Sequence, residues 1–159
     1  MEIISKMKLI APQPGTRIVH LGHDYVGKPL LTEVEAKFFE QLELLAGGRC
    51  RIMCKPRMAD FVQHLGSGFQ KISQKHVDFL IFRLGDWMPM LAIELDDSSH
   101  DSKEASYRDT FKNNLCAHLG LPLLRINVRE IENLHRLVKE LSSGWERRCQ
   151  QLGLPNGQP

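Results

Sequence analysis

The sequence contains no apolar run that approaches the roughly 20 residues needed to span a bilayer. Its 159 residues carry a net charge of only +2, so there is no global basic field to indicate a nucleic-acid partner. Lys6 and Lys8 interrupt the N-terminal apolar stretch, which therefore does not resemble a secretory signal. We expect a cytoplasmic protein with no membrane partner.

Cysteine is scarce, with four residues in the chain. Cys50 and Cys54 are separated by three residues without a matching Cys or His pair nearby, and four thiols do not resemble a disulfide framework in a chain of this length. A structural zinc site is therefore not expected, and buried reduced thiols are the better interpretation. There is no internal repeat or low-complexity tract, and the length suits one domain.

Hydrophobic periodicity predicts the element order α-β-β-β-α-β-α. The predicted helices span about 32–46, 102–119 and 129–145, and the predicted strands about 49–58, 75–82, 88–96 and 122–128. Residues 1–30, interrupted by proline and glycine, are expected to form a peripheral arm, 31–150 the α/β domain and 151–159 a flexible tail. Residues 63–70 are expected to form a loop. The order predicts an α/β sandwich, a mixed sheet of about four strands flanked by helices.

Local signals define the ends of two of these helices. Thr32 and Glu35 fit a capping box at the start of the first helix, and Asn127 with Glu130 fits another at the start of the last. The residues expected to be buried on the last helix are Ile131, Leu134, Val138, Leu141 and Trp145.

Acidic residues lie at the ends of the two central strands. If these strands form a hairpin centred on Asp86, positions whose numbers sum to about 172 face each other, and Asp78 lies opposite Glu94. Strand alternation places Glu94 and Asp96 on one face of the sheet. Three carboxylates are therefore expected to converge on one patch.

Such a cluster costs stability unless a cation or protons neutralise it, because like charges repel. Oxygen ligands of this kind suit Mg²⁺ or Mn²⁺, which can activate water and stabilise developing charge on a phosphate. The alternative is that acidic residues at strand ends are solvated turn residues. Asp78 and Glu94 fit this alternative less well, because they lie within apolar runs and a carboxylate there needs a partner.

Several motifs occur in a characteristic order. They are Val77-Asp78-Phe79, then Ala-Ile-Glu-Leu-Asp-Asp-Ser-Ser-His at 92–100, then Arg108-Asp109, then Gly-Leu-Pro-Leu-Leu-Arg-Ile at 120–126. Together they resemble a bacterial nuclease-like family, domain-of-unknown-function family 2726, which is similar to very-short-patch-repair endonucleases in the PD-(D/E)XK nuclease superfamily. The resemblance covers about 31–128. It implies a restriction-endonuclease-like fold and metal-dependent hydrolysis of DNA.

The resemblance also implies a role for each matching residue. Asp78 would be the strand carboxylate that binds Mg²⁺ or Mn²⁺, Glu94 would be the second acid, and the carbonyl of Leu95 would be a further ligand. Glu35 matches the helical glutamate of many such nucleases, although a capping box explains this residue equally well.

The sequence departs from the superfamily at Asp96, where the motif has lysine. The usual cation near the attacking water is therefore missing. His100 is a candidate general acid or base in its place, and Lys112 is a candidate to reach in from the following helix. Two possibilities stay open: an altered mechanism, or a nucleic-acid or protein interaction module that has lost catalysis.

A basic strip lies beside this acidic segment. The residues predicted to contact nucleic acid are Arg49, Arg51, Lys55, Arg57, Lys75 and Arg108. A basic strip next to an acidic pocket suits a phosphate polymer that crosses a metal site, although a solvated strand face explains Arg49 and Arg51 as well. DNA is the expected partner. The oligomeric state is left open, with a homodimer among the possibilities.

Overall fold

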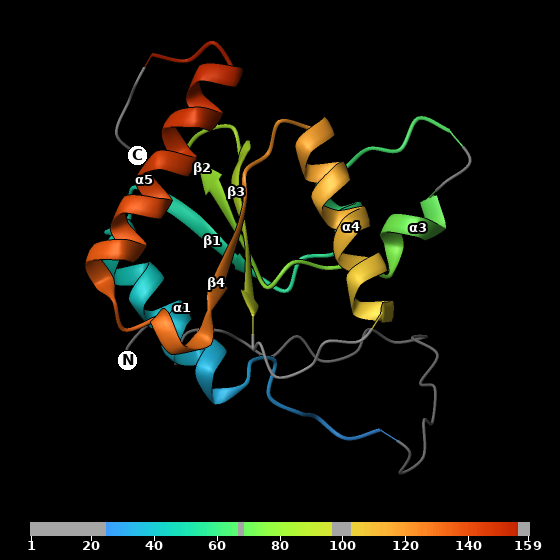
Figure 1. Cartoon of the computed structure of the whole chain (residues 1–159), viewed down its shortest axis with the longest axis horizontal. Coiled ribbons are helices and arrows are strands. Elements are labelled where there is room, and N and C mark those ends of the chain that lie inside the picture. The colour runs from blue at the N-terminus through green and yellow to red at the C-terminus, as the bar shows by residue number, and fades with distance from the viewer. Residues whose placement is uncertain (1–24, 67–68, 97–102, 156–159) are drawn as a thin grey trace, which may run out of the picture. The chain divides into compact units, whose positions relative to one another are not determined.

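The computed structural model describes residues 25–66, 69–96 and 103–155, with side chains in the last stretch from residue 110 onward. Contacts between residues divide the chain into two units, Met1–Leu30 and Leu31–Pro159. The helices and strands named below all belong to the second unit (Figure 1).

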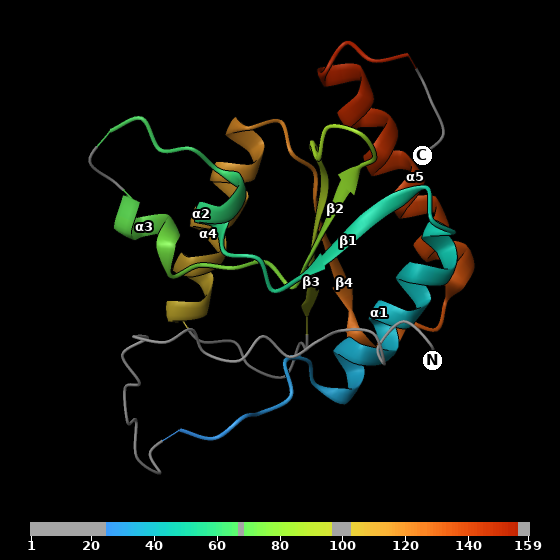
Figure 2. The same cartoon turned by 180° about the vertical axis from the view of Figure 1, so that it is seen from behind.

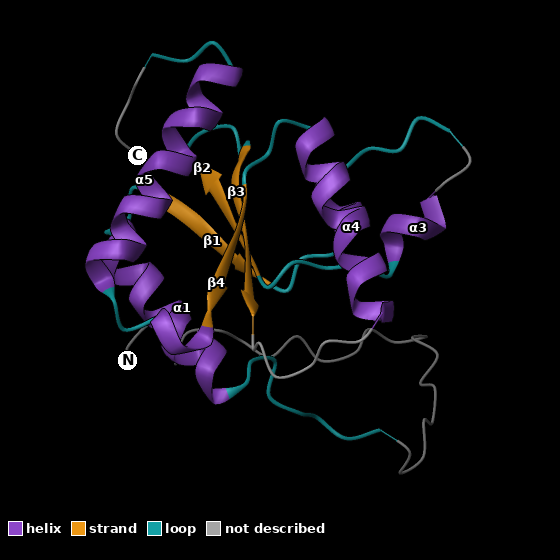
Figure 3. Cartoon of the chain, in the orientation of Figure 1, coloured by secondary structure: helices purple, strands orange, loops and turns teal. Residues whose placement is uncertain are grey.

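A four-stranded mixed sheet forms the centre of this unit, with the strand order β1-β2-β3-β4 (Figure 3). The strands are β1 (Cys50–Cys54), β2 (Phe79–Arg83), β3 (Pro89–Asp96) and β4 (Leu123–Asn127). Strands β1, β2 and β3 pair antiparallel in that order, whereas β4 runs parallel to β3. The predicted mixed sheet is therefore confirmed, and the parallel pair is joined by a helical crossover, as such pairs require.

Helices cover both faces of the sheet, so the predicted α/β sandwich is confirmed (Figures 1 and 2). On one side lie α1 (Glu33–Ala46) and α5 (Leu134–Gln151), and on the other lie α2 (Met58–Phe61), α3 (Phe69–Ser73) and α4 (Lys103–His118). A short 3₁₀ segment, η2 (Val128–Glu130), links β4 to the last helix.

Strand alternation divides the apolar residues between two cores. Phe79 and Ile93 point to the α1 and α5 side, where they pack in one cluster with Phe38. Leu80 and Ala92 point to the opposite side, where their cluster includes Cys116 of α4. Each fully buried side chain of the size of Phe79 or Leu80 contributes about 1.5–3 kcal/mol, so both sides of the sheet hold the hairpin in place.

The capping box at Thr32 and Glu35 is confirmed, because each side chain bonds to the backbone N–H of the other residue. The capping box predicted at Asn127 is wrong. Asn127 Oδ1 accepts from the backbone N–H of Arg129 at 2.9 Å and begins η2. Helix α5 starts later, with Asn133 as its N-cap.

The late start of α5 changes which of its residues are buried. Leu134 and Val138 are 50% and 44% exposed, so their predicted burial is wrong, whereas Leu137 is buried. The predicted burial of Trp145 is confirmed. The helix continues to Gln151, and Leu152 and Leu154 still pack against the core. Packing therefore extends into the expected tail, of which 156–159 lie outside the described residues.

The region between β1 and β2 also differs from the prediction. The first strand ends at Cys54, because Lys55 has a left-handed φ of 52° and Pro56 has no N–H for the ladder. Beyond them, Arg57 forms only an isolated bridge with His76. Helices α2 and α3, absent from the prediction, lie on either side of the expected loop: α2 begins at the predicted end of the strand, and α3 begins within the last two residues of the loop.

All four cysteines are free thiols, and Cys50, Cys116 and Cys149 are buried while Cys54 is partly buried. Within the described ranges, no helix combines the length and apolar character required to cross a membrane.

Candidate functional site

The hairpin register places Asp78 opposite Glu94, as predicted. Phe79 pairs with Ile93 and Leu80 with Ala92, so the next position along brings Asp78, which directly precedes β2, to the level of Glu94. Asp78 lies two residues from Leu80, and Glu94 lies two residues from Ala92. Because side chains alternate along a strand, both acids belong to the same sheet face as Leu80 and Ala92, which α4 covers. The predicted register and common face are confirmed.

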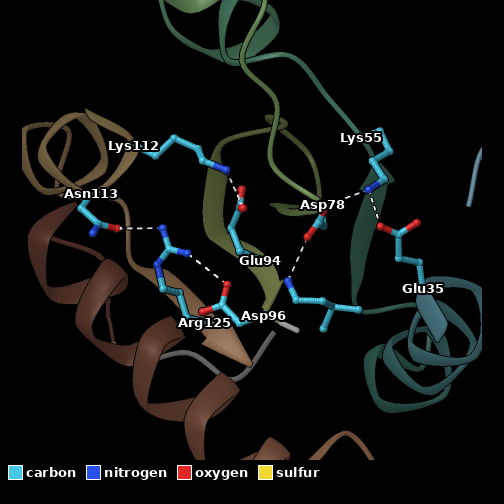
Figure 4. A network of polar contacts seen from close by, with 9 residues as sticks. Glu35, Lys55, Asp78, Glu94, Asp96, Lys112, Asn113 and Arg125 are labelled. Atoms are coloured by element: carbon cyan, nitrogen blue, oxygen red, sulfur yellow. Dashed lines mark hydrogen bonds and ion pairs between the residues drawn. The ribbon is translucent and has the colours of Figure 1, made fainter. Parts of the chain in front are cut away.

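Asp78 is linked to Glu35 of α1 by a lysine between them (Figure 4). Lys55 Nζ lies 2.7 Å from Asp78 Oδ1 and also donates to Glu35 Oε1. The three side chains are only 14–21% exposed. Glu35 therefore both caps α1 and joins the site, so the two interpretations of this residue from the sequence are compatible.

The charges of this lysine-centred group stabilise one another. Burial opposes ionisation of Glu35, but hydrogen bonds from Lys55 and Thr32 outweigh it and lower the pKa of Glu35. Burial likewise opposes the charge on Lys55, yet hydrogen bonds to Asp78 and Glu35 raise the pKa of its ammonium. Glu35 and Lys55 are thus held in their charged forms at neutral pH.

The second oxygen of Asp78 binds the backbone of β3. Asp78 Oδ2 accepts from the N–H of Leu95 at 2.9 Å. Both carboxylate oxygens of Asp78 are therefore engaged, one by a cation and one by a peptide group. Leu95 reaches the site through this peptide group, and the metal-ligand role of its carbonyl stays a prediction.

Glu94 is the most deeply placed acid of the site, with 9% of its surface exposed. Lys112 of α4 donates to Glu94 Oε2, whereas Oε1 is buried without a hydrogen-bond partner among the described residues. Burial raises the pKa of Glu94; the charge of Asp78 adds to this effect, and Lys112 opposes it. A buried oxygen without a partner is costly, so Glu94 is poised to accept a proton or a cation.

Asp96 is turned toward a different partner. Arg125 Nη1 lies 3.2 Å from Asp96 Oδ1, and its Nη2 donates to Asn113 Oδ1 at 3.3 Å. Within the described residues, no group of three or more His, Cys, Asp or Glu side chains is arranged to hold a metal ion. The predicted convergence of three carboxylates is therefore corrected to a pair, Asp78 and Glu94.

The predicted alternatives to the missing lysine have different outcomes. Lys112 does reach one of the carboxylates, that of Glu94. His100 lies outside the described residues, so its role stays a prediction.

The six predicted DNA contacts have diverse surroundings. Lys55 is part of the carboxylate site, not of an exposed strip. Arg49 donates to the carbonyls of Leu45 and Ala46 at the end of α1, and Arg57 pairs with Asp60. Arg51 is exposed on β1, and Lys75 Nζ lies 5.3 Å from the ring centroid of Phe111. The side chain of Arg108 is outside the described residues.

Two cations of the site were not assigned to it from the sequence, Lys55 and Arg125. Strand alternation placed Lys55 with the exposed basic residues, but the left-handed backbone at this position turns it toward Asp78. Arg125 is paired with Glu94 in the parallel β3–β4 register, which brings its charge close enough to affect the pKa of Glu94. In the sequence, the sign that Arg125 has a partner was its position within an apolar strand.

The fold and the site define an α/β sandwich domain with an acid and lysine cluster at one end of its central hairpin. Residues 27–143 match the family described as Protein of unknown function (DUF2726), and the chain belongs to this family. Neither a curated protein nor a solved structure matches the chain. The chemistry must therefore be inferred from the site itself.

Proposed function

We propose that this domain is a metal-dependent DNA phosphodiesterase of the PD-(D/E)XK type, with Asp78 and Glu94 as the metal-binding acids. The observation that carries this proposal is the facing pair of largely buried carboxylates, in which Glu94 Oε1 has no hydrogen-bond partner within the described part of the chain. A purely structural ion-pair network would be expected to satisfy this oxygen.

The donor set fits a magnesium-like ion. Mg²⁺ commonly binds through one or two carboxylates and fills its remaining positions with water and substrate phosphate. Asp78 and Glu94 supply two such ligands, and the Leu95 carbonyl is a third candidate from the family resemblance. When bound, the ion would activate water and offset the charge that develops on the phosphate.

The cations of the chain supply positive charge where the superfamily lysine is missing. Lys112 binds Glu94, which places an ammonium group beside the acid pair. Lys112 is therefore the better-supported substitute for the lysine replaced by Asp96, with His100 as the second candidate for proton transfer. Asp96 has a different task, because it holds the guanidinium of Arg125.

DNA remains the proposed substrate because exposed basic residues flank Lys55 in the chain. Arg51 and Arg57 are exposed on and just beyond β1, the strand that leads into the site at Lys55. Contacts of this kind bind the phosphate backbone without reading sequence. Affinity for DNA should therefore fall as salt rises.

The second candidate function is an interaction module without catalysis. It is favoured by the pairing of each carboxylate with a cation of the chain itself, because such a network is neutralised without metal. Under this alternative, DNA or a protein would bind in the presence of EDTA as well as in Mn²⁺.

A nuclease assay separates these functions. Wild-type protein is incubated with supercoiled, linear and single-stranded DNA in Mg²⁺, Mn²⁺ or EDTA. The phosphodiesterase predicts cleavage of at least one substrate that requires metal. Metal-independent DNA binding without cleavage would support the module, and cleavage that persists in EDTA would contradict the metal site.

A further inference from the structure

We propose that Lys55 is a built-in counter-ion that a metal displaces from Asp78, and that Glu35 retains its ammonium group after displacement. The inference rests on the proposed function, since it concerns the same metal. It assigns Lys55 and Glu35 as positioning residues that set the affinity of the site for metal, and it does not make Glu35 a ligand.

The two acids of the pair differ in their availability. Glu94 Oε1 has no hydrogen-bond partner in residues 25–66, 69–96 and 110–155, whose side chains the structure describes. Asp78 has no such free oxygen, because Oδ1 binds Lys55 Nζ at 2.7 Å and Oδ2 binds the Leu95 N–H at 2.9 Å. An ion that bridges the pair therefore competes with Lys55, because a divalent cation and an ammonium group on one carboxylate oxygen repel each other strongly.

The backbone of Lys55 is held in an unusual conformation at this point. Its φ of 52° lies in the left-handed region, which residues other than glycine rarely adopt. Such conformations persist where the surrounding structure holds them, and they concentrate at functional sites. Here the Lys55 N–H donates to the Asp78 carbonyl at 2.8 Å. The base of the side chain is thus fixed beside Asp78, while the ammonium group at the end of its stem contacts both Asp78 and Glu35.

Glu35 is built to receive that group. Its Oε2 accepts from the Thr32 N–H at 2.9 Å in the capping box, and its Oε1 accepts from Lys55. The cap fixes the carboxylate independently of Asp78. When a metal occupies Asp78, Lys55 still has a partly buried anionic partner, which lowers the cost of the exchange.

The test measures Mn²⁺ affinity by calorimetry in the full chain. Lys55→Met removes the competitor and should raise affinity on the order of 10-fold. Glu35→Gln should lower the Mn²⁺ affinity. Of the two acids that Lys55 contacts, Asp78 alone then keeps its charge, so displacing Lys55 from Asp78 costs more. In the double variant Glu35→Gln with Lys55→Met, the Glu35 substitution should no longer lower affinity. Lys37→Met, which breaks an exposed pair with Glu132, serves as the matched control.

Opposite results overturn the inference. If Glu35 were a direct ligand, Glu35→Gln would weaken Mn²⁺ binding equally with and without Lys55. Unchanged or weaker binding by Lys55→Met, or no Mn²⁺ binding by any variant, would also reject it. Lys55→Gln, which keeps most of the stem, replaces Lys55→Met if that variant does not fold.

DNA cleavage by the wild type is measured in parallel, so that the two proposals can fail separately. The expected affinity pattern without cleavage would reject the phosphodiesterase and keep the exchange. Metal-dependent cleavage, together with a Mn²⁺ affinity that does not change when Lys55 is substituted, would keep the phosphodiesterase and reject the exchange.

Discussion

Asp78→Asn asks whether attraction or repulsion dominates the carboxylate site in the absence of metal. The substitution keeps the size of the side chain and removes its charge. Asp78 attracts Lys55 at 2.7 Å but also acts on Glu94, whose pKa it helps to raise. Attraction predicts a loss of stability, and repulsion predicts a gain.

The contacts set the expected size of the effect. Exposed ion pairs contribute about 0–1 kcal/mol, and breaking a fully buried pair costs about 3–5 kcal/mol. The pair of Lys55 and Asp78 lies between these limits, with side chains 21% and 14% exposed. Lys55 keeps Glu35 as a partner, and the Asn oxygen can still accept from Leu95. We therefore expect a net loss of about 1–2 kcal/mol, or about 2–8 °C in Tm for a domain of this size.

Thermal unfolding in EDTA at neutral pH measures this effect. Glu132→Gln, which removes the acid of an exposed pair with Lys37, is the control and should leave Tm nearly unchanged. A higher Tm for Asp78→Asn would mean that repulsion dominates, and the stabilising role assigned to Lys55 would be wrong.

Three further substitutions test the packing around the site. Lys112→Met leaves the Glu94 carboxylate unpaired and should cost about 2–4 kcal/mol at neutral pH. Because burial raises the pKa of Glu94, protonation of this residue stabilises the fold at low pH, and that stabilisation is lost as pH rises through the pKa. The cost of Lys112→Met should therefore be smaller in acid, where Glu94 is protonated. Unfolding curves that show the same loss of stability at about pH 5 and at about pH 7 would contradict this. Gly144→Ala would place a Cβ 2.7 Å from Leu91 Cδ2 and should cost about 1–3 kcal/mol in urea unfolding, whereas a neutral result would mean that the core at α5 adapts. Thr32→Ala removes an N-cap and should lower the free energy of unfolding by about 1 kcal/mol; an unchanged value in the same assay would show that the cap contributes little.

The placement of Asp78 opposite Glu94 was predictable because strand geometry has a strict period. Two apolar runs separated by a turn at Gly85 and Asp86 define a hairpin, and its register follows from the centre of the turn. The observed pairing keeps this register from Phe79 to Ile81 and shifts only beyond it, next to the turn. The face that carries the acids was therefore available from the sequence.

The partners of those acids were not predictable in the same way. The direction of Lys55 depends on one left-handed backbone angle, which periodicity does not encode. Arg125 reaches Asp96 through the parallel register of β3 and β4, and these strands are joined by the whole of α4. No local turn fixes such a register. The N-cap of α5 at Asn133 was missed because Asn127 offered an equally good capping signal.

The most direct test of the proposed phosphodiesterase compares cleavage of one DNA substrate by wild type, Glu94→Gln and Glu132→Gln in saturating Mn²⁺. Glu94→Gln removes a proposed ligand, and loss of the several kcal/mol that a metal contributes to the transition state corresponds to at least about a 100-fold lower rate. Glu132→Gln, in an exposed pair with Lys37, should cleave at the wild-type rate. Cleavage by folded Glu94→Gln at the wild-type rate, or none by the wild type, would contradict the account.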